Sequence, residues 1–193
     1  FNAISCIQEY VMHRNPLEAS SYLSNFAKLM RSILNNSSKE LISLDEEIET
    51  LENYLKLQEL RFPNKFEYTI QVDDKLETED LFIPPMLSQP FIENAIQHGV
   101  AKLKQDKGKI CIQFEVSEGS LLLSITDNGP GLSDVITHSN HVSMATLITK
   151  RRINNFKKKY KQHVNFEIID LASENKGLSG VKVVFGLPLK YGN

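Results

Sequence analysis

Apolar residues recur at spacings of three and four along the first sixty positions, which is the pattern of amphipathic helices. The first apolar stripe comprises Phe1, Ile4, Ile7 and Val11. Asn15-Pro16 is typical of an N-cap followed by proline at the first helical position, and Glu18 is placed to close a capping box. A second helix is therefore predicted, ending in the polar turn 35–38, and its apolar face comprises Leu23, Phe26, Ala27, Met30, Ile33 and Leu34.

A third helix is predicted to begin at Ser43, because Glu46 follows it as a capping-box partner. Its apolar positions are Ile48, Leu51, Leu55 and Leu60. Two helices joined by a tight turn form an antiparallel hairpin, and the apolar stripes of that hairpin must be covered. They can pack on the remainder of the same chain, or on a second copy of the hairpin to give a four-helix bundle.

The period changes after residue 64 to the alternation that is typical of half-buried strands. Strands are predicted at 66–72, 110–116, 121–125, 164–170 and 181–187. A helix from Met86 to His98 is predicted to close at Gly99, and a basic helix is predicted at 150–161 with Ile153, Phe156 and Tyr160 buried. This order of elements predicts an α+β chain, in which a helical hairpin precedes an α/β sandwich with a mixed sheet.

Composition narrows the class of protein only a little. A length of 193 residues, with 41% hydrophobic and 24% charged residues, is normal for one globular domain or two small ones. No apolar run reaches the roughly 18 residues that a membrane helix needs. A net charge of −2 gives no reason to expect nucleic-acid binding, and the two cysteines, Cys6 and Cys111, have no metal-ligand spacing.

The segment Asp127-Asn128-Gly129-Pro130-Gly131 directly follows an apolar strand and cannot form regular structure. Because Asn-Gly after a strand is also a common turn signal, a purely structural role is one interpretation. The other interpretation is chemical. A carboxylate fixed at a strand end can accept a hydrogen bond from an exocyclic amine such as that of adenine, and glycines beside it let the backbone approach a nucleotide closely.

The second candidate segment is Glu93-Asn94-Ala95-Ile96-Gln97-His98-Gly99. On a helix, Asn94 and His98 lie one turn apart on the same face. The amide oxygen of Asn94 suits Mg²⁺, which retains most of its waters and its substrate phosphates. Alternatively, Asn94 is an ordinary surface residue, and His98 only interacts favourably with the end of the helix. One loop and one hairpin separate the two segments, so both can line a single cleft.

Together the two segments resemble a known family. Residues 93–99 resemble the N box, and residues 127–131 resemble the G1 box, of the GHKL (Bergerat) ATPase fold. The run Pro84-Pro85-Met86-Leu87-Ser88-Gln89-Pro90 ahead of the N box is similar to the LytS-like sensor histidine kinases. A further similarity to the helix that leads into the first strand of that family is carried by Leu55, Gln58, Leu60, Arg61 and Phe62.

The start of the chain also resembles this family. The phosphoacceptor motif of the family is His-Phe-hydrophobic-Phe-Asn-Ala, and this chain opens with Phe1-Asn2-Ala3-Ile4. The resemblance therefore places the acceptor histidine three residues before Phe1, outside the sequence. The chain is accordingly expected to be a fragment, truncated just after the acceptor.

The resemblance implies a role for each matching residue. Asn94 corresponds to the Mg²⁺-binding asparagine, and Asp127 corresponds to the aspartate that reads the adenine amine. Glu93, Asn94 and His98 correspond to the catalytic positions near the phosphates. The expected nucleotide site also includes the glycines that hinge a lid over ATP and two residues of the basic helix. This set comprises Asn94, His98, Asp127, Asn128, Gly129, Gly131, Lys150 and Arg152.

Two positions depart from the family pattern. The run His141-Val142-Ser143-Met144-Ala145-Thr146 stands where many relatives have a second glycine-rich box, although some LytS-like relatives have a similar form. Gly180-Val181 stands where relatives often have Gly-Thr. These departures leave weak ATP binding open. The basic run 150–161 has no aromatic platform or DNA-binding motif beside it, which favours a solvated helix face over a nucleic-acid site.

The expected organisation is a dimerisation hairpin at 1–42, without its acceptor histidine, and a catalytic ATP-binding domain at 43–193. The resemblance implies a protein-histidine kinase that uses ATP and Mg²⁺ to phosphorylate a histidine and then passes the phosphoryl group to an aspartate of a response regulator. It implies a homodimer formed through the N-terminal helices. It also implies a cytoplasmic region, anchored to the inner membrane by segments upstream of Phe1.

Two other interpretations are kept beside this one. The first is a degenerate, non-catalytic GHKL module that dimerises and signals by shape, which the altered lid box and Val181 motivate. The second is another GHKL ATPase of the gyrase or mismatch-repair type. The helices expected between Phe1 and Leu34 argue against that second interpretation, because such ATPases need transducer domains instead.

Overall fold

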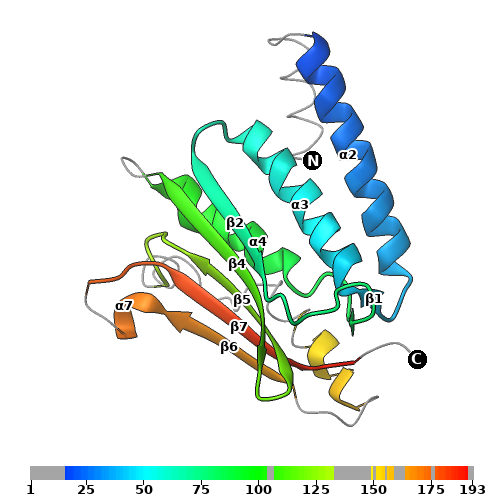
Figure 1. Cartoon of the computed structure of the whole chain (residues 1–193). Helices are drawn as coiled ribbons and strands as arrows, with labels where there is room; N and C mark the ends of the chain where they lie inside the picture. The colour runs from blue at the N-terminus through cyan, green and yellow to red at the C-terminus, as the bar shows by residue number, and fades with distance from the viewer. Residues whose placement is uncertain are drawn as a thin grey trace.

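The fold has two layers, a five-stranded sheet and the helices that cover one of its faces (Figure 1). The computed structural model describes residues 16–103, 107–132, 149, 151–154, 156–158, 164–174 and 177–190. In spatial order the strands of the sheet are β2 (Phe66–Val72), β4 (Gly108–Ser117), β5 (Ser120–Asp127), β7 (Val181–Pro188) and β6 (Asn165–Asp170). β2 and β4 are parallel and the other neighbouring pairs are antiparallel, so the predicted mixed sheet is confirmed.

Helices α2 (Pro16–Ser37) and α3 (Leu44–Arg61) form the predicted hairpin, with α2 on the outside of α3 (Figure 1). Ser43 caps α3 as predicted, because its side chain accepts a hydrogen bond from the Glu46 amide at 3.2 Å. The Asn36 amide group donates to Thr50 Oγ1 at 3.3 Å, which ties the end of α2 to α3. The helical stripe predicted at 1–11 and the cap predicted at Asn15 lie outside the described residues.

The apolar face predicted for α2 is divided between two surfaces. One set packs on the rest of the chain and comprises Ala19, Tyr22, Phe26, Leu29 and Ile33. The other set, which we call the outer seam, is exposed and comprises Leu23, Ala27, Met30 and Leu34. Both sets follow alternating spacings of three and four, which is the spacing of residues that pack between helices. α2 therefore has one seam against its own chain and a second seam that faces outward.

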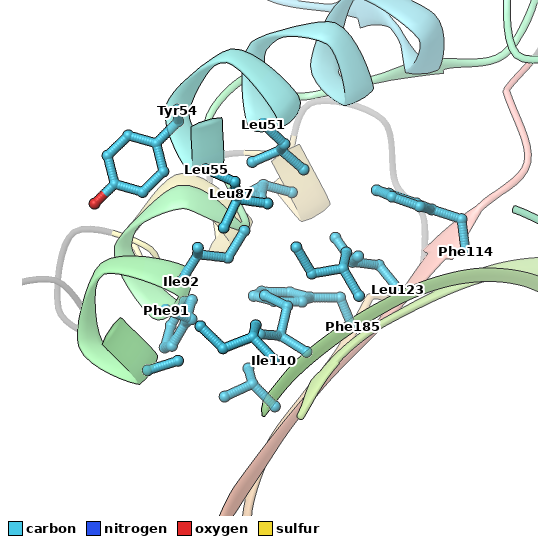
Figure 2. Packing of buried hydrophobic residues seen from close by; sticks show 14 of the residues in the cluster. Leu51, Tyr54, Leu55, Leu87, Phe91, Ile92, Ile110, Phe114, Leu123 and Phe185 are labelled. Atoms are coloured by element: carbon cyan, nitrogen blue, oxygen red, sulfur yellow. The ribbon is translucent and has the colours of Figure 1, made fainter. Parts of the chain in front are cut away.

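The core lies between the sheet and helices α3 and α4 (Gln89–Asn94) (Figure 2). Apolar side chains alternate along β4 and β5, so every second residue faces the helices. From α4, the Phe91 ring lies with its centroid 5.4 Å from the Phe166 ring and 5.5 Å from the Phe185 ring. This packing holds α4 over the sheet and brings it near the end of β5, where the segment 127–131 begins.

The helix predicted at 86–98 differs from the structure at both ends. Met86 has a φ of 59°, which no right-handed helix allows, so α4 begins only at Gln89. At the other end α4 continues into a π-helical turn at Ala95–Gly99 and a 3₁₀ turn at Val100–Lys102. The prediction of one continuous α-helix was therefore wrong, although Phe91 in its middle is buried as a helix packed on the sheet requires.

Three short elements were not predicted. β1 (Ile42–Ser43) pairs antiparallel with β3 (Phe82–Ile83), and α7 (Leu171–Glu174) follows β6 where only a turn was expected. β1 leads directly into α3, and β3 precedes the loop that leads to α4. The β1–β3 ladder therefore fixes the start of α3 beside the segment that precedes α4.

The basic helix predicted at 150–161 is confirmed where the structure describes it. Residues 151–154 and 156–158 are helical, and Ile153 and Phe156 are buried. Tyr160, the third residue expected to be buried, lies outside the described part. Among the helices described, none is both long enough and apolar enough to cross a membrane.

Candidate functional site

Asp127 is the last residue of β5, at the point where the strand leaves the sheet. Its side chain is 7% exposed, and its Oδ1 atom accepts a hydrogen bond from the Gly129 amide at 2.8 Å. Burial raises the pKa of the Asp127 carboxyl from 3.8, while hydrogen bonds from the Gly129 and Val181 backbone lower it. The sequence therefore places a largely desolvated carboxylate at the C-terminal end of the central strand, where it can accept a hydrogen bond from a ligand.

Glycines from three separate segments lie against Asp127, two beside its carboxylate and one beside its main chain. A Cβ atom on Gly129 would lie 2.5 Å from the Gly99 Cα atom and 2.7 Å from Asp127 Oδ1. A Cβ atom on Gly180, where φ is +120°, would collide with the Asp127 carbonyl oxygen. Gly99 ends the π-helical turn and Gly180 precedes β7, so both predicted boxes meet around Asp127. A side chain at any of these positions would collide with Asp127 or with the neighbouring backbone, so glycine is required for the segments to meet here.

The rest of the G1-like segment is held by its neighbours. The Asn128 side chain accepts a hydrogen bond from the Lys109 amide at 2.6 Å through Oδ1, so it attaches the segment to β4. Gly131 has a φ of 87° and lies against Asp170, whose Oδ2 atom accepts a hydrogen bond from the Leu132 amide at 3.3 Å. Asp170 thus anchors the beginning of the segment that follows Gly131, a role that no local sequence signal marks.

Asn94 and His98 lie on the N-box-like segment, on either side of the change in helix type. Asn94 is half-buried at the last position of α4, and His98 is exposed within the π-helical turn. The wider π turn alters the one-turn relation that an α-helix would give the two side chains. Such turns recur at functional sites, and this one ends at Gly99 beside Asp127. The structure therefore brings the Asn94 segment and the Asp127 segment together, as the sequence predicted.

Glu93 precedes Asn94 and is partly buried against α3. The Gln89 side chain donates a hydrogen bond to Glu93 Oε1 at 3.3 Å, one helical turn away. Burial raises the pKa of the Glu93 carboxyl from 4.5, and the hydrogen bond from Gln89 lowers it less. Burial also raises the pKa of the nearby Tyr54 hydroxyl, and the Glu93 charge adds to that effect.

The raised pKa of Glu93 predicts a pH-dependent stability. Above pH 4.5, and up to the higher pKa of the folded state, the folded chain holds more protons than the unfolded chain. The Glu93 contribution to the free energy of unfolding is therefore expected to fall as pH rises through this interval. Urea denaturation at a series of pH values upward from 4.5 measures this free energy. It should decrease less with pH in Glu93→Gln than in the unaltered chain. The same dependence of unfolding free energy on pH in both chains would contradict the raised pKa of Glu93. Glu115→Gln, on the exposed side of β4, is the control and should behave as the unaltered chain does.

Arg152 was expected in the nucleotide site, and in the structure it contacts the loop that precedes α4. Its Nη1 atom donates hydrogen bonds to the carbonyl oxygens of Pro85 at 3.1 Å and Met86 at 3.3 Å. These contacts hold the loop that precedes α4, and the same loop is bonded to Glu47 of α3, a residue that the sequence analysis missed. Glu47 follows two other acidic residues, Asp45 and Glu46, and nothing in the local sequence distinguishes it from them. Only its hydrogen bonds to the loop identify its structural role.

Other expected parts of the site cannot be placed. Lys150 and the lid residues 141–146 lie outside the described residues. In the part of the chain that is described, no group of three or more His, Cys, Asp or Glu side chains is placed to hold a metal ion. The candidate site therefore consists of the described residues Glu93, Asn94, His98, Asp127 and the surrounding glycines.

The arrangement of the sheet, α4 and the two boxes is that of a GHKL histidine kinase catalytic domain, and solved structures share it. The histidine kinase domain of the blue-light activated kinase EL346 from Erythrobacter litoralis covers 96% of this chain and 81% of its own chain, with a TM-score of 0.55 and 15% identity. The mycobacterial sensor histidine kinase MprB covers 79% of this chain and 99% of its own, with a TM-score of 0.50 and 15% identity. At these identities the likeness establishes the fold.

Sequence comparisons narrow the class. The family model described as histidine kinase matches residues 1–66. The sensor protein LytS of Bacillus anthracis is 28% identical over 203 residues, covering the whole of this chain and 32% of its own length. LytS of Oceanobacillus iheyensis is 35% identical over 117 residues, covering 61% of this chain and 20% of its own length. In sequence the chain is similar to the LytS sensor proteins and in fold to histidine kinase domains, and it spans at most about a third of the length of the curated relatives it matches.

Proposed function

We propose that this chain binds ATP with Mg²⁺ and is the catalytic region of a sensor histidine kinase. The observation that carries the proposal is the buried Asp127 carboxylate at the point where Gly99 of the N-box-like segment meets Gly129 of the G1-like segment. Glycine at these positions lets the N-box-like and G1-like backbones approach each other and Asp127 more closely than any side chain would allow. The charged oxygen then selects a ligand that donates from an exocyclic amine, as adenine does.

The N-box-like segment supplies the groups expected near the phosphates. Asn94 offers a neutral amide oxygen at the end of α4, which fits a metal that takes only one or two protein ligands. Mg²⁺ bound there would neutralise charge on the β- and γ-phosphates. Glu93, whose pKa is raised by burial, is placed next to Asn94 and can accept a hydrogen bond or a proton. His98 is exposed and free to approach phosphate oxygens.

The proposed reaction transfers the γ-phosphoryl group to a histidine. The imidazole nitrogen forms a bond to the γ-phosphorus while the bond to the ADP oxygen breaks, and catalysis rests mainly on positioning and charge neutralisation. The phosphoryl group would then pass to an aspartate of a response regulator. The relatives named sensor histidine kinases support this assignment, although the chain covers only a part of each of them.

Labelled ATP tests the transfer directly. A chain that carries the expected acceptor histidine ahead of Phe1 should form acid-labile, base-stable phosphohistidine with Mg²⁺ present. Asn94→Ala should reduce this labelling by at least about 100-fold, because it removes the proposed metal ligand. Gln97→Ala, at an exposed position of the same turn, is the matched control and should retain it. If Asn94→Ala labels as strongly as Gln97→Ala, the metal assignment is wrong.

We also propose a homodimer formed through the outer seam of α2. Leu23, Met30 and Leu34 are 41%, 38% and 64% exposed at the spacing of a helix-packing seam. Pairing two copies would remove these side chains from water and complete a helical bundle.

Charge placed on this seam should break the dimer. Leu23→Lys is expected to raise the dimer dissociation constant about 100-fold, because apolar burial is lost in both copies. Asn35→Lys adds the same charge on another face of α2 and should leave the dimer intact. Light scattering over a range of protein concentrations measures the mass. A monomeric mass for the unaltered chain, or equal behaviour of the two variants, would contradict the proposal.

The proposed reaction places this region on the cytoplasmic side of a membrane-anchored protein, since ATP and response regulators are there. A degenerate module that signals without catalysis is the second candidate. Arg152 favours it, because its hydrogen bonds go to the loop carbonyls of Pro85 and Met86, whereas a contact with the triphosphate was expected. ATP binding without phosphohistidine formation, in a chain that includes the acceptor, would support the second candidate.

A further inference from the structure

A buried carboxylate joins α3 to the loop that precedes α4. Glu47 is 1% exposed, and burial raises the pKa of its carboxyl. Glu47 Oε1 accepts a hydrogen bond from Ser88 Oγ at 2.7 Å, and Oε2 accepts one from the Met86 amide at 3.1 Å. Placing an acidic group in the interior is costly unless its oxygens are bonded, and here each oxygen has a bond from the same loop.

The loop itself is strained. Met86 is a non-glycine residue with a φ of 59°, a conformation that persists only when its surroundings hold it. Glu47 holds the Met86 amide from one side. Arg152 holds the carbonyl oxygens of Pro85 and Met86 from a helix more than sixty residues further along the chain. The Arg152 charge also lowers the pKa of Glu47, so the two charged groups act on each other as well as on the loop.

Ser88 connects this arrangement to the candidate site. The Ser88 carbonyl oxygen accepts hydrogen bonds from the Phe91 amide at 3.0 Å and the Ile92 amide at 3.1 Å, which form the first turn of α4. α4 has only six residues, and its last residue is Asn94. A shift of Ser88 therefore moves a short, rigid helix and displaces Asn94 with it.

We propose that Glu47, Ser88 and Arg152 form a clamp that sets the position of α4 against α3, and that they are positioning residues for the nucleotide site. The inference rests on the proposed function, because its effect is expressed as nucleotide affinity. α3 is the second helix of the hairpin, so the clamp also links the hairpin mechanically to the nucleotide site. None of the three residues needs to contact the nucleotide.

The clamp assigns Arg152 a role that differs from direct contact with the triphosphate, and the two roles predict different results for paired substitutions. If Arg152 acts through the loop, then Arg152 and the Glu47–Ser88 hydrogen bond are both needed to fix the loop. Once one of them is lost, losing the other should lower ATP affinity little further. The effects of Arg152→Ala and Ser88→Ala on ATP affinity should then be strongly non-additive. If Arg152 contacts phosphate, the two effects should add.

The test measures ATP affinity with Mg²⁺ by calorimetry, well below the unfolding temperature of each variant. Arg152→Ala and Ser88→Ala should each weaken affinity about three- to tenfold, and the double variant should be no weaker than the worse single one. Arg152→Lys should recover most of the affinity, since an ammonium group can also donate to the two carbonyls. Arg151→Ala, at the exposed neighbouring position, is the control and should bind as the unaltered chain does.

A second readout does not depend on nucleotide. Hydrogen exchange at the Met86 amide should accelerate in Ser88→Ala and Arg152→Ala and not in Arg151→Ala. Unchanged exchange, additive losses of affinity, or equal affinity of Arg152→Ala and Arg151→Ala would overturn the clamp while leaving the proposed function in place. Failure of the unaltered chain to bind ATP would instead overturn the proposed function, and the positioning role with it.

Discussion

Asp127→Asn is expected to weaken ATP binding about 10- to 100-fold, because a hydrogen bond to a charged acceptor contributes about 1.5–3 kcal/mol. Asparagine has nearly the same shape, so its side-chain oxygen can still accept the 2.8 Å hydrogen bond from the Gly129 amide. The substitution removes the charge and replaces one acceptor with a donor, which faces the adenine amine unfavourably. It removes the cost of burying a carboxylate and also weakens the hydrogen bonds from the Gly129 and Val181 backbone, so the two effects on stability oppose each other.

Calorimetric titration with ATP measures this effect, and circular dichroism confirms that the variant remains folded. Asp80→Asn makes the same chemical change in an exposed turn and should bind ATP as the unaltered chain does. Affinity of Asp127→Asn within about twofold of this control would place the adenine elsewhere. In that case Asp127 would be only a turn residue, which was the other interpretation of the Asp-Asn-Gly sequence.

Phe185→Ala is expected to lower the free energy of unfolding by about 3–5 kcal/mol, the usual cost of removing a buried phenylalanine side chain. Phe185 is fully buried on β7, and its ring centroid lies 5.0 Å from that of Phe166 and 5.5 Å from that of Phe91 on α4 (Figure 2). The resulting cavity would lie directly beneath α4. Weaker ATP binding should accompany the loss of stability, since α4 carries Asn94.

Urea denaturation measures the stability of this variant. Val184→Ala, on the other face of the same strand, is half-buried and should cost about 1 kcal/mol or less. If Phe185→Ala lowers the free energy of unfolding no more than Val184→Ala does, the packing of α4 on the sheet does not stabilise the fold as described. The comparison of these adjacent positions therefore distinguishes the loss of core packing from a general destabilisation of β7.

Hydrophobic periodicity was sufficient to predict the long elements. The alternation along β2, β4 and β5, and the capping box at Ser43, predicted those elements nearly to the residue because each signal is local. The β1–β3 ladder has only two residues on each side, and its existence depends on residues forty positions apart. No local pattern can specify such a pair. The left-handed backbone at Met86, which delays the start of α4, likewise depends on bonds from Glu47 and Arg152.

The two boxes of the candidate site were found because their residue types are specific, and the structure brings them together at Gly99 and Gly129. The supporting residues were not found. Glu47 and Asp170 are ordinary acidic residues in sequence, and only their partners in space distinguish them. Arg152 was identified as basic and near the site, yet its hydrogen bonds are made to loop carbonyls. A sequence reveals the residues that meet a ligand more readily than the residues that hold them in place.

The central claim is that this chain binds ATP through Asp127 and the Asn94 segment, and calorimetric titration with ATP, with and without Mg²⁺, tests it most directly. The expected result is one ATP bound per chain, with affinity at least about tenfold higher when Mg²⁺ is present. Asn94→Ala should remove that Mg²⁺ dependence while retaining the metal-free affinity. The absence of any binding heat at high protein concentration, or Mg²⁺ dependence that survives Asn94→Ala, would contradict the account.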